Sequence, residues 1–67
     1  MIQIRLQDES GKVVRWSIQR DARPPAGWNF TDHQGYTRFV EGTWRDLVAR
    51  FKNTAANYNL SLLSDLS

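Results

Sequence analysis

Residues 43 to 58 read TWRDLVARFKNTAANY, and this stretch decides the fold because its apolar spacing fits only an α-helix. Each helical residue turns by about 100°, so side chains three, four and seven positions apart collect on one stripe. The stripe carries no charge and consists of Trp44, Leu47, Val48, Phe51, Ala55 and Tyr58. The segment therefore predicts an amphipathic helix with one face in the core.

Signals for both ends of this helix flank the stripe. Thr43 and Asp46 have the spacing of a capping box, in which the hydroxyl accepts a hydrogen bond from a free amide of the first turn. The helix should therefore begin at Trp44. Asn57 and Asn59 are the candidate ends, because Asn tolerates the left-handed conformation that closes helices where Gly is absent.

The arc of the helix opposite the stripe is a candidate contact surface. Its residues are two cations with small and polar side chains between them: Arg45, Ala49, Lys52, Asn53 and Ala56. Asp46 and Arg50 are four positions apart and are predicted to pair, which leaves Arg45 and Lys52 without a partner. Alanine lets a backbone approach closely, so the arc fits a groove or DNA phosphates, although a solvated helix face has the same composition.

Residues 28 to 40 predict a hairpin with two possible registers. A four-residue turn from Asp32 to Gly35 would pair Trp28 with Phe39 and place Trp28, Phe30 and Phe39 inside. The outer face would then hold Asn29, Thr31, Tyr36 and Arg38. A three-residue loop with Gly35 as a bulge would shift the register and bring Arg38 to the aromatic face. The first register is preferred because it separates polar from apolar side chains.

Residues 2 to 18 predict another hairpin, with Ile4 opposite Trp16 and Leu6 opposite Val14. The loop from Glu9 to Gly11 fits a type I turn with Gly in the bulge position. The alternation from the first residue onward predicts a strand rather than a signal peptide.

The same register places Arg5 directly across from Arg15 on the outward face, where like charges are mildly destabilising. Three interpretations are open. The two guanidiniums form a phosphate or carboxylate site, they extend into solvent, or Asp21 or Glu41 neutralises them.

The tail, residues 60 to 67, has two interpretations. Leu60 and Leu62 cover a sheet edge, or Ser61 caps a short helical turn that carries Leu62, Leu63 and Leu66. Leucines that did not pack on the chain itself would form an exposed patch that favours another subunit. Residues 1 to 67 are predicted to be one domain, with residues 60 to 67 as a loosely packed tail.

The fold class predicted from these segments is α+β. An antiparallel sheet of about four strands, formed by two hairpins, should pack on one C-terminal amphipathic helix. The expected inner face of the sheet holds Ile2, Ile4, Leu6, Val14, Trp16, Ile18, Trp28, Phe30 and Phe39. Three Trp, three Phe and two Tyr among 67 residues supply enough apolar surface for one small core.

Composition excludes several classes of site. The chain has no cysteine, which excludes disulfides and thiolate metal sites and fits the reducing cytoplasm. No window approaches the roughly 18 apolar residues of a membrane span. The single histidine, His33, lies in a predicted turn, and neither metal-ligand spacing nor a glycine-rich phosphate loop is present. We therefore expect no enzyme, cofactor, metal or small-molecule substrate.

Two binding functions remain. The first is a small non-enzymatic binding protein that contacts a protein partner or its own copies through the outer helix face and an exposed strand edge. The alternative is a nucleic-acid-binding module whose phosphate contacts would be Arg5, Arg15, Arg38, Arg45 and Lys52. The net charge of +2 is a small electrostatic footprint for a polyanionic partner.

Residues 24 to 60 resemble a group of small bacteriophage-encoded proteins. The shared order is Pro-Pro-Ala-Gly-Trp28-Asn-Phe30, then Gly35-Tyr36, Gly42-Thr43-Trp44, Leu47-Val48, Ala56-Asn57 and Leu60. In those proteins a basic residue precedes the Ala-Asn pair, where this chain has Ala55. The resemblance implies a phage or prophage accessory protein that works by binding in the host cytoplasm, and it transfers no site residue.

Overall fold

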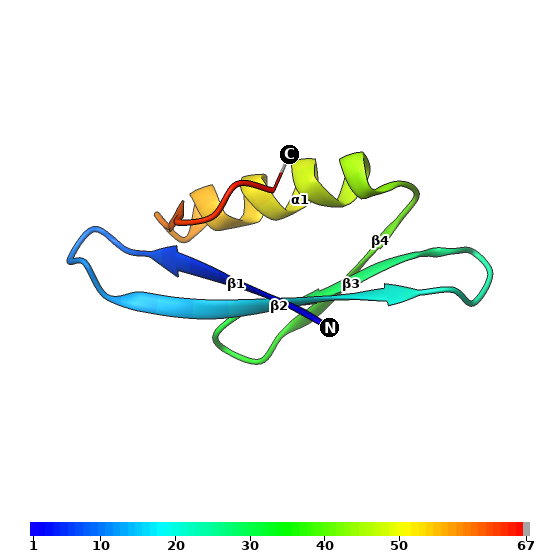
Figure 1. The fold of residues 1–67 in the computed structure, drawn as a ribbon, viewed down its shortest axis with the longest axis horizontal. Coiled ribbons are helices and arrows are strands. Elements are labelled where there is room, and N and C mark those ends of the chain that lie inside the picture. Colours follow the sequence, from blue (N-terminus) through cyan, green and yellow to red (C-terminus); the bar gives the residue numbers. More distant parts are fainter. Residues whose placement is uncertain (67) are drawn as a thin grey trace.

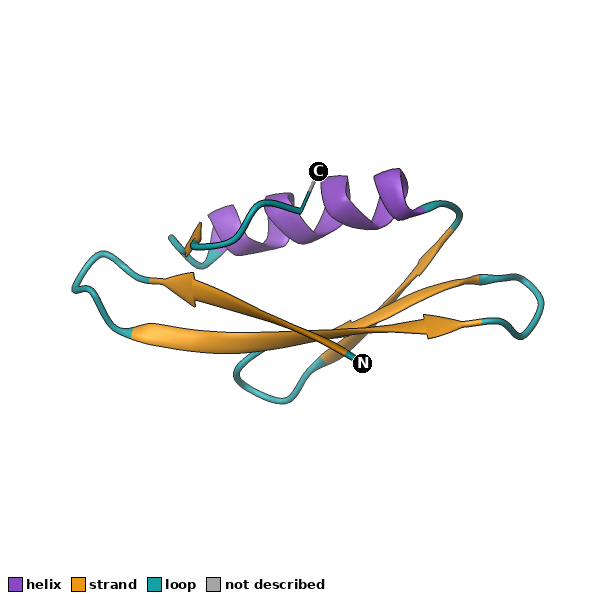
Figure 2. Cartoon of the chain, viewed as in Figure 1, coloured by secondary structure: helices purple, strands orange, loops and turns teal. Residues whose placement is uncertain are grey.

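The computed structural model describes residues 1 to 66, which form two layers (Figures 1 and 2). The elements in chain order are β1 (Ile2–Gln7), β2 (Val13–Asp21), β3 (Gly27–Thr31), β4 (Thr37–Glu41), α1 (Trp44–Asn57) and β5 (Ser61–Leu62). The strands form one antiparallel sheet in the order β4-β3-β2-β1-β5, and α1 covers one of its faces. The predicted α+β architecture is confirmed, with a short fifth strand added.

The first hairpin has the predicted register. Ile4 pairs with Trp16, Leu6 with Val14, and Arg5 with Arg15. The amide of Asp8 donates to the carbonyl of Lys12 at 3.0 Å, and Gly11 adopts a φ of 91° in the bulge position. Turn chemistry and face pattern agree here, so local sequence determines the register.

The preferred register of the second hairpin is wrong by one residue. Trp28 pairs with Val40, Asn29 with Phe39 and Phe30 with Arg38, which is the alternative with Gly35 as the bulge. Arg38 therefore lies on the face that carries Phe30, and Phe39 lies on the opposite face with 44% of its surface exposed. The sequence predicted Phe39 inside and Arg38 outside, and both predictions are wrong.

Two packing features explain this register. Phe39 lies over Gly27 on the outer face, where a β-carbon on the glycine would come within 2.7 Å of the phenyl ring. Only a residue without a side chain leaves that space for an aromatic ring from the next strand. On the inner face, the carboxylate of Asp32 accepts a hydrogen bond of 2.8 Å from the guanidinium of Arg38 and forms an ion pair with it. Arg38 can therefore lie on the same face as the aromatic rings, because its charge is paired with Asp32.

The helix ends are stabilised as predicted. The hydroxyl of Thr43 accepts from the amide of Asp46, and the Asp46 carboxylate accepts from the amide of Thr43 at 2.9 Å, which completes a capping box. At the other end the amide of Leu60 donates to the carbonyl of Ala55 at 2.9 Å, and Asn59 has a φ of 58°. This is a Schellman closure with Asn in the position that Gly usually occupies.

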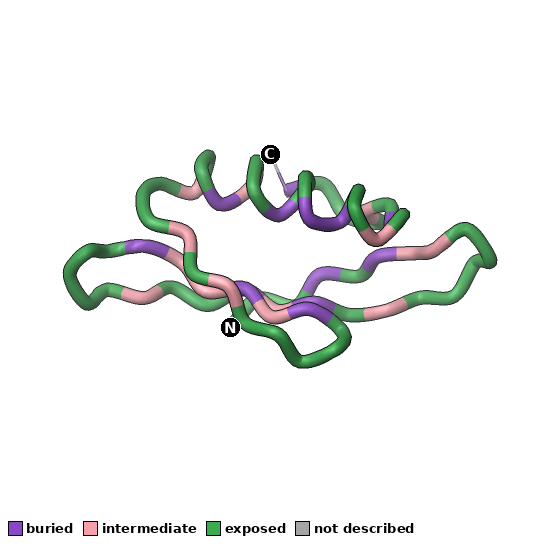
Figure 3. Tube along the Cα trace, turned by 180° about the vertical axis from the view of Figure 1, so that it is seen from behind, coloured by how far each residue is buried: buried purple, intermediate pink, exposed green. Residues whose placement is uncertain are grey.

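The core lies between α1 and the sheet, and the buried stretches of the two layers face each other (Figure 3). Aromatic rings fill its centre: Trp16 lies 5.1 Å from Phe51 and 6.1 Å from Phe30, measured between ring centroids. The buried apolar residues are Ile4, Leu6, Trp16, Ile18, Phe30, Leu47, Phe51, Ala55, Leu60 and Leu66. Ile2, which was expected inside, is 46% exposed at the start of β1.

The tail packs on its own chain. Ser61 and Leu62 form β5, which pairs with Gln7 and Leu6 at the edge of β1, so the interpretation in which the tail covers a sheet edge is confirmed for the described residues. Leu60 and Leu66 are buried, and the indole of Trp44 donates to the carbonyl of Leu66 at 3.0 Å. Ser67 lies outside the described residues. The leucines of this segment therefore belong mainly to the core.

Candidate functional site

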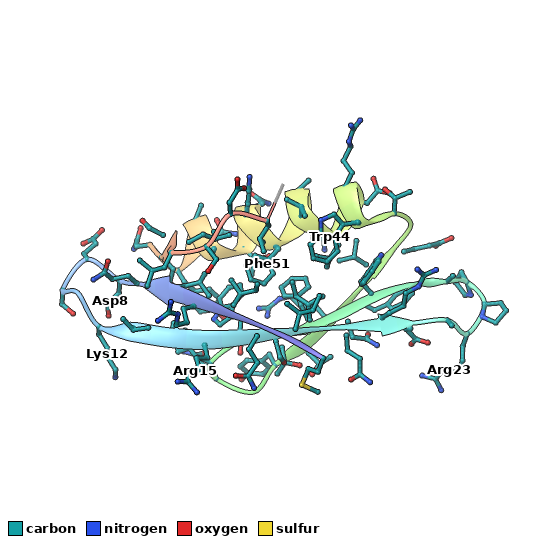
Figure 4. All side chains as sticks on the ribbon, in the orientation of Figure 1. Asp8, Lys12, Arg15, Arg23, Trp44 and Phe51 are labelled. Carbon is teal, nitrogen blue, oxygen red and sulfur yellow. The ribbon has the colours of Figure 1, made fainter. Side chains whose placement is uncertain are left out.

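Arg5 and Arg15 lie on the sheet face that the helix leaves uncovered, and both are exposed. Figure 4 shows the Arg15 side chain on the side of the sheet away from the helix. Asp21 does not neutralise them, because its carboxylate accepts from Arg23 at 3.2 Å and from Asn29 at 3.3 Å. The hydrogen bonds from Arg23 lower the pKa of Asp21. The two opposed guanidiniums thus form an outward-facing cationic pair.

Arg38 is held inside a polar network that the sequence did not predict. Its guanidinium donates to Asp32 at 2.8 Å and to the hydroxyl of Tyr58 at 3.4 Å, and it lies 5.9 Å from the ring centroid of Phe30. The Tyr58 hydroxyl also donates to Asp32 at 3.0 Å. Arg38 is therefore engaged by the fold and is removed from the set of candidate phosphate contacts.

Asp32 is the centre of this network, with 4% of its surface exposed. Burial raises its pKa, but hydrogen bonds from Arg38, from the Tyr36 amide, from Tyr58 and from the Gln34 amide outweigh burial and hold the pKa below its ordinary value. The hydrogen bond to Asp32 in turn raises the pKa of Arg38. A buried carboxylate with this many donors is a structural anchor that joins the β3–β4 turn to the helix end.

His33 follows Asp32 in the β3–β4 turn and is exposed, as expected for a turn residue. Its Nδ1 accepts a hydrogen bond of 3.1 Å from the buried indole of Trp16, and its ring stacks on Trp16 with centroids 6.3 Å apart. The imidazole thus satisfies the only polar atom of the largest core side chain.

The outer surface of α1 carries the other predicted contact residues, which separate into two shallow grooves. One groove, of about 500 Å³, is lined by Trp44, Arg45, Val48, Ala49 and Lys52. The second, of about 460 Å³, is lined by Val40, Glu41, Asp46, Ala49, Arg50 and Asn53. We call the second the β4–α1 groove, because it lies between the edge strand and the helix. Ala49 lines both grooves, since its small side chain leaves the helix surface low at that point.

The predicted pair between Asp46 and Arg50 is wrong. The Asp46 carboxylate is occupied by Thr43 in the capping box, and the hydrogen bonds from Thr43 lower its pKa. Arg50 therefore adds a cation to the wall of the β4–α1 groove.

The outer edge of β4 has no strand beside it in residues 1 to 66, because β4 is the last strand of the sheet order. Hydrogen-bonded pairs alternate in an antiparallel ladder. The amide of Asp32 donates to Tyr36 at 3.0 Å and the amide of Gly42 to Ala26 at 3.2 Å. Residues 38 and 40 therefore bond to β3. Residues 37, 39 and 41 direct their amides and carbonyls away from the sheet.

The opposite edge of the sheet is partly paired with the C-terminal tail. β5 pairs with the last two residues of β1, and the amide of Leu63 donates to the carbonyl of Arg5 at 3.0 Å. The chain thus covers much of one edge with its own tail and leaves the β4 edge open beside a groove. The sequence prediction named an exposed strand edge without residues, because the register of the second hairpin decides which backbone groups are free.

Two other kinds of site were sought in the part of the chain that the structure describes: a metal-binding cluster and a membrane-spanning helix. Within the described residues, His, Asp and Glu side chains nowhere gather in a group of three that could hold a metal ion. No helix in residues 1 to 66 has the length and apolarity needed to cross a lipid bilayer. Comparisons of the chain with protein-family models, with curated proteins and with solved structures gave no match. The assignment of function therefore depends on the surfaces described above.

Proposed function

We propose that this chain is a small non-enzymatic binding protein that contacts another polypeptide through the open β4 edge and the adjoining surface of α1. The supporting observation is the row of unpaired backbone groups at Thr37, Phe39 and Glu41, which runs beside the β4–α1 groove. An extended segment added to such an edge gains backbone hydrogen bonds, and a neighbouring groove accepts its alternate side chains. Natural sheets usually protect edges that have no partner.

The absence of cysteine supports a place in the reducing cytoplasm, which would be the host cytoplasm for a phage-encoded accessory protein. A protein of this kind works by occupying a surface of its partner. The outer helix residues Arg45, Ala49, Lys52 and Asn53 would form the second half of the contact.

Phe39→Pro tests this function, because the Phe39 amide points away from the sheet and proline there removes no internal hydrogen bond. We expect the variant to stay folded and to lose whatever polypeptide the wild-type protein binds, whether a lysate protein in a pull-down or its own copies in light scattering. Phe39→Thr is the matched control, since it also removes the ring but keeps the amide. A wild-type protein that is strictly monomeric and captures nothing would refute the function.

The cationic pair of Arg5 and Arg15 supports a second candidate function, polyanion binding on the open sheet face. If both contact phosphates, affinity for duplex DNA should fall roughly tenfold between about 50 and 200 mM salt, and Arg5→Ser with Arg15→Ser should reduce the log-log salt slope by about two. Titrations across a series of salt concentrations measure this slope. Folding should be unchanged or slightly improved, because the substitutions relieve like-charge repulsion. Salt-independent or absent DNA binding by the wild-type protein would exclude this candidate.

A further inference from the structure

The β4 edge has features that select its occupant. The strand reads TRFVE, and antiparallel pairing of this strand with itself around Phe39 places Thr37 opposite Glu41 and Arg38 opposite Val40. Glu41 then meets a neutral hydroxyl instead of a like charge. The Arg38 guanidinium, held by Asp32, stays out of the way. The edge strand is thus compatible with a second copy of itself.

The charges of the β4–α1 groove favour the same arrangement. Glu41 and Asp46 lie where the strand turns into the helix, and Arg50 lies one helical turn beyond Asp46. A two-fold axis reverses the direction of the second groove, so its acidic end faces the basic side of the first. Charge complementarity of this kind fixes orientation and disfavours other partners.

We propose that two copies of this chain associate through antiparallel pairing of β4 with β4, around a two-fold axis at Phe39, to form one continuous sheet. The inference rests on the proposed function and names its polypeptide partner as a second copy. Every backbone group that the edge leaves unpaired at residues 37, 39 and 41 then finds a partner in the other copy. A five-residue strand pair buries less than the roughly 1,600 Å² of a standard interface, so the dimer should be weak and concentration-dependent.

Light scattering over a dilution series tests the association directly. We expect the mass to rise from 7.8 kDa toward twice that value with concentration. Phe39→Thr should retain the rise and Phe39→Pro should abolish it, because only proline removes the amide at the axis. A dimer that survives Phe39→Pro in a folded protein would use another surface and would overturn the proposal.

A crosslinking variant tests the geometry without depending on proline. The chain has no cysteine, so Phe39→Cys introduces a single thiol. At the axis the two α-carbons should be about 5.5 Å apart, within the range that a disulfide spans. Under mild oxidation we expect Phe39→Cys to form covalent dimers much faster than Glu9→Cys, whose thiol would lie on the exposed β1–β2 turn. Equal rates for the two variants would contradict the proposal.

Failure of the dimer can be told apart from failure of the function. A monomer that captures another protein through an interaction lost in Phe39→Pro and kept in Phe39→Thr would overturn the dimer and retain the binding function. A monomer that captures nothing would refute both.

Discussion

Asp32→Asn should lower the free energy of unfolding by about 3 kcal/mol, because the fully buried carboxylate accepts several hydrogen bonds, and an amide would turn an NH₂ group toward some of these donors. The carboxylate accepts from Arg38 at 2.8 Å and from Tyr58 at 3.0 Å, and its side chain is fully shielded from solvent. In a domain of this size such a loss corresponds to a fall of about 15 °C in the melting temperature. Thermal unfolding followed by circular dichroism measures it.

The pH dependence of this loss has a definite sign. The pKa of Asp32 is lowered in the folded protein, so the unfolded chain takes up the proton first as the pH falls. The stability that Asp32 contributes is therefore complete above its unfolded pKa of about 3.9 and is lost as the pH falls through the lower folded value. The difference in melting temperature between wild type and Asp32→Asn should be largest at neutral pH and should shrink in acid.

Asp21→Asn is the matched control, since Asp21 also pairs with an arginine. Its partner Arg23 has 88% of its side chain exposed, so solvent screens the interaction and a much smaller change is expected. An Asp32→Asn protein that melts with the wild type at neutral pH, or a difference that stays constant into acid, would show that the carboxylate is not the anchor described here.

Local sequence was sufficient for the helix and for the first hairpin. The stripe from Trp44 to Tyr58 and the capping box at Thr43 lie within one segment, and the bulge at Gly11 is set by a three-residue loop. These signals act between residues that are close in sequence, so no tertiary contact competes with them. The cationic pair of Arg5 and Arg15 follows from the same register.

The second hairpin was mispredicted because its register is decided by residues distant in sequence. Arg38 can face the core only because Asp32 and Tyr58 satisfy its guanidinium, and Tyr58 lies 20 residues further along the chain. The sequence prediction placed charged side chains on the face away from the aromatic rings. It did not consider that Tyr58, at the end of the helix, could hydrogen-bond to Arg38. The free edge at Phe39, and with it the proposed site, follows from this register. Local pattern therefore gave this register as one of two alternatives but could not select it.

Phe30→Ala should destabilise the protein by about 4 kcal/mol, because it removes a ring from the centre of a closely packed core. Phe30 is fully buried and lies 5.5 Å from Phe51 and 6.1 Å from Trp16, between ring centroids. So large a loss could unfold a small domain, whose whole stability is only about 5 kcal/mol. Phe30→Leu, which keeps most of the volume, is the variant in which a smaller loss can be measured by urea unfolding.

Phe39→Ala and Phe39→Leu are the matched substitutions, and each should cost clearly less than its counterpart at Phe30, because less apolar surface is removed from water at this position. Phe39 is 44% exposed on the outer face, with its ring over Gly27. Unfolding should be measured at low protein concentration, so that association through β4 does not add to the result. In the register with Trp28 opposite Phe39, both phenylalanines would be internal and both sets of variants would lose comparable stability. A large difference between the two positions therefore supports the observed register, and with it the orientation of the backbone groups at the β4 edge.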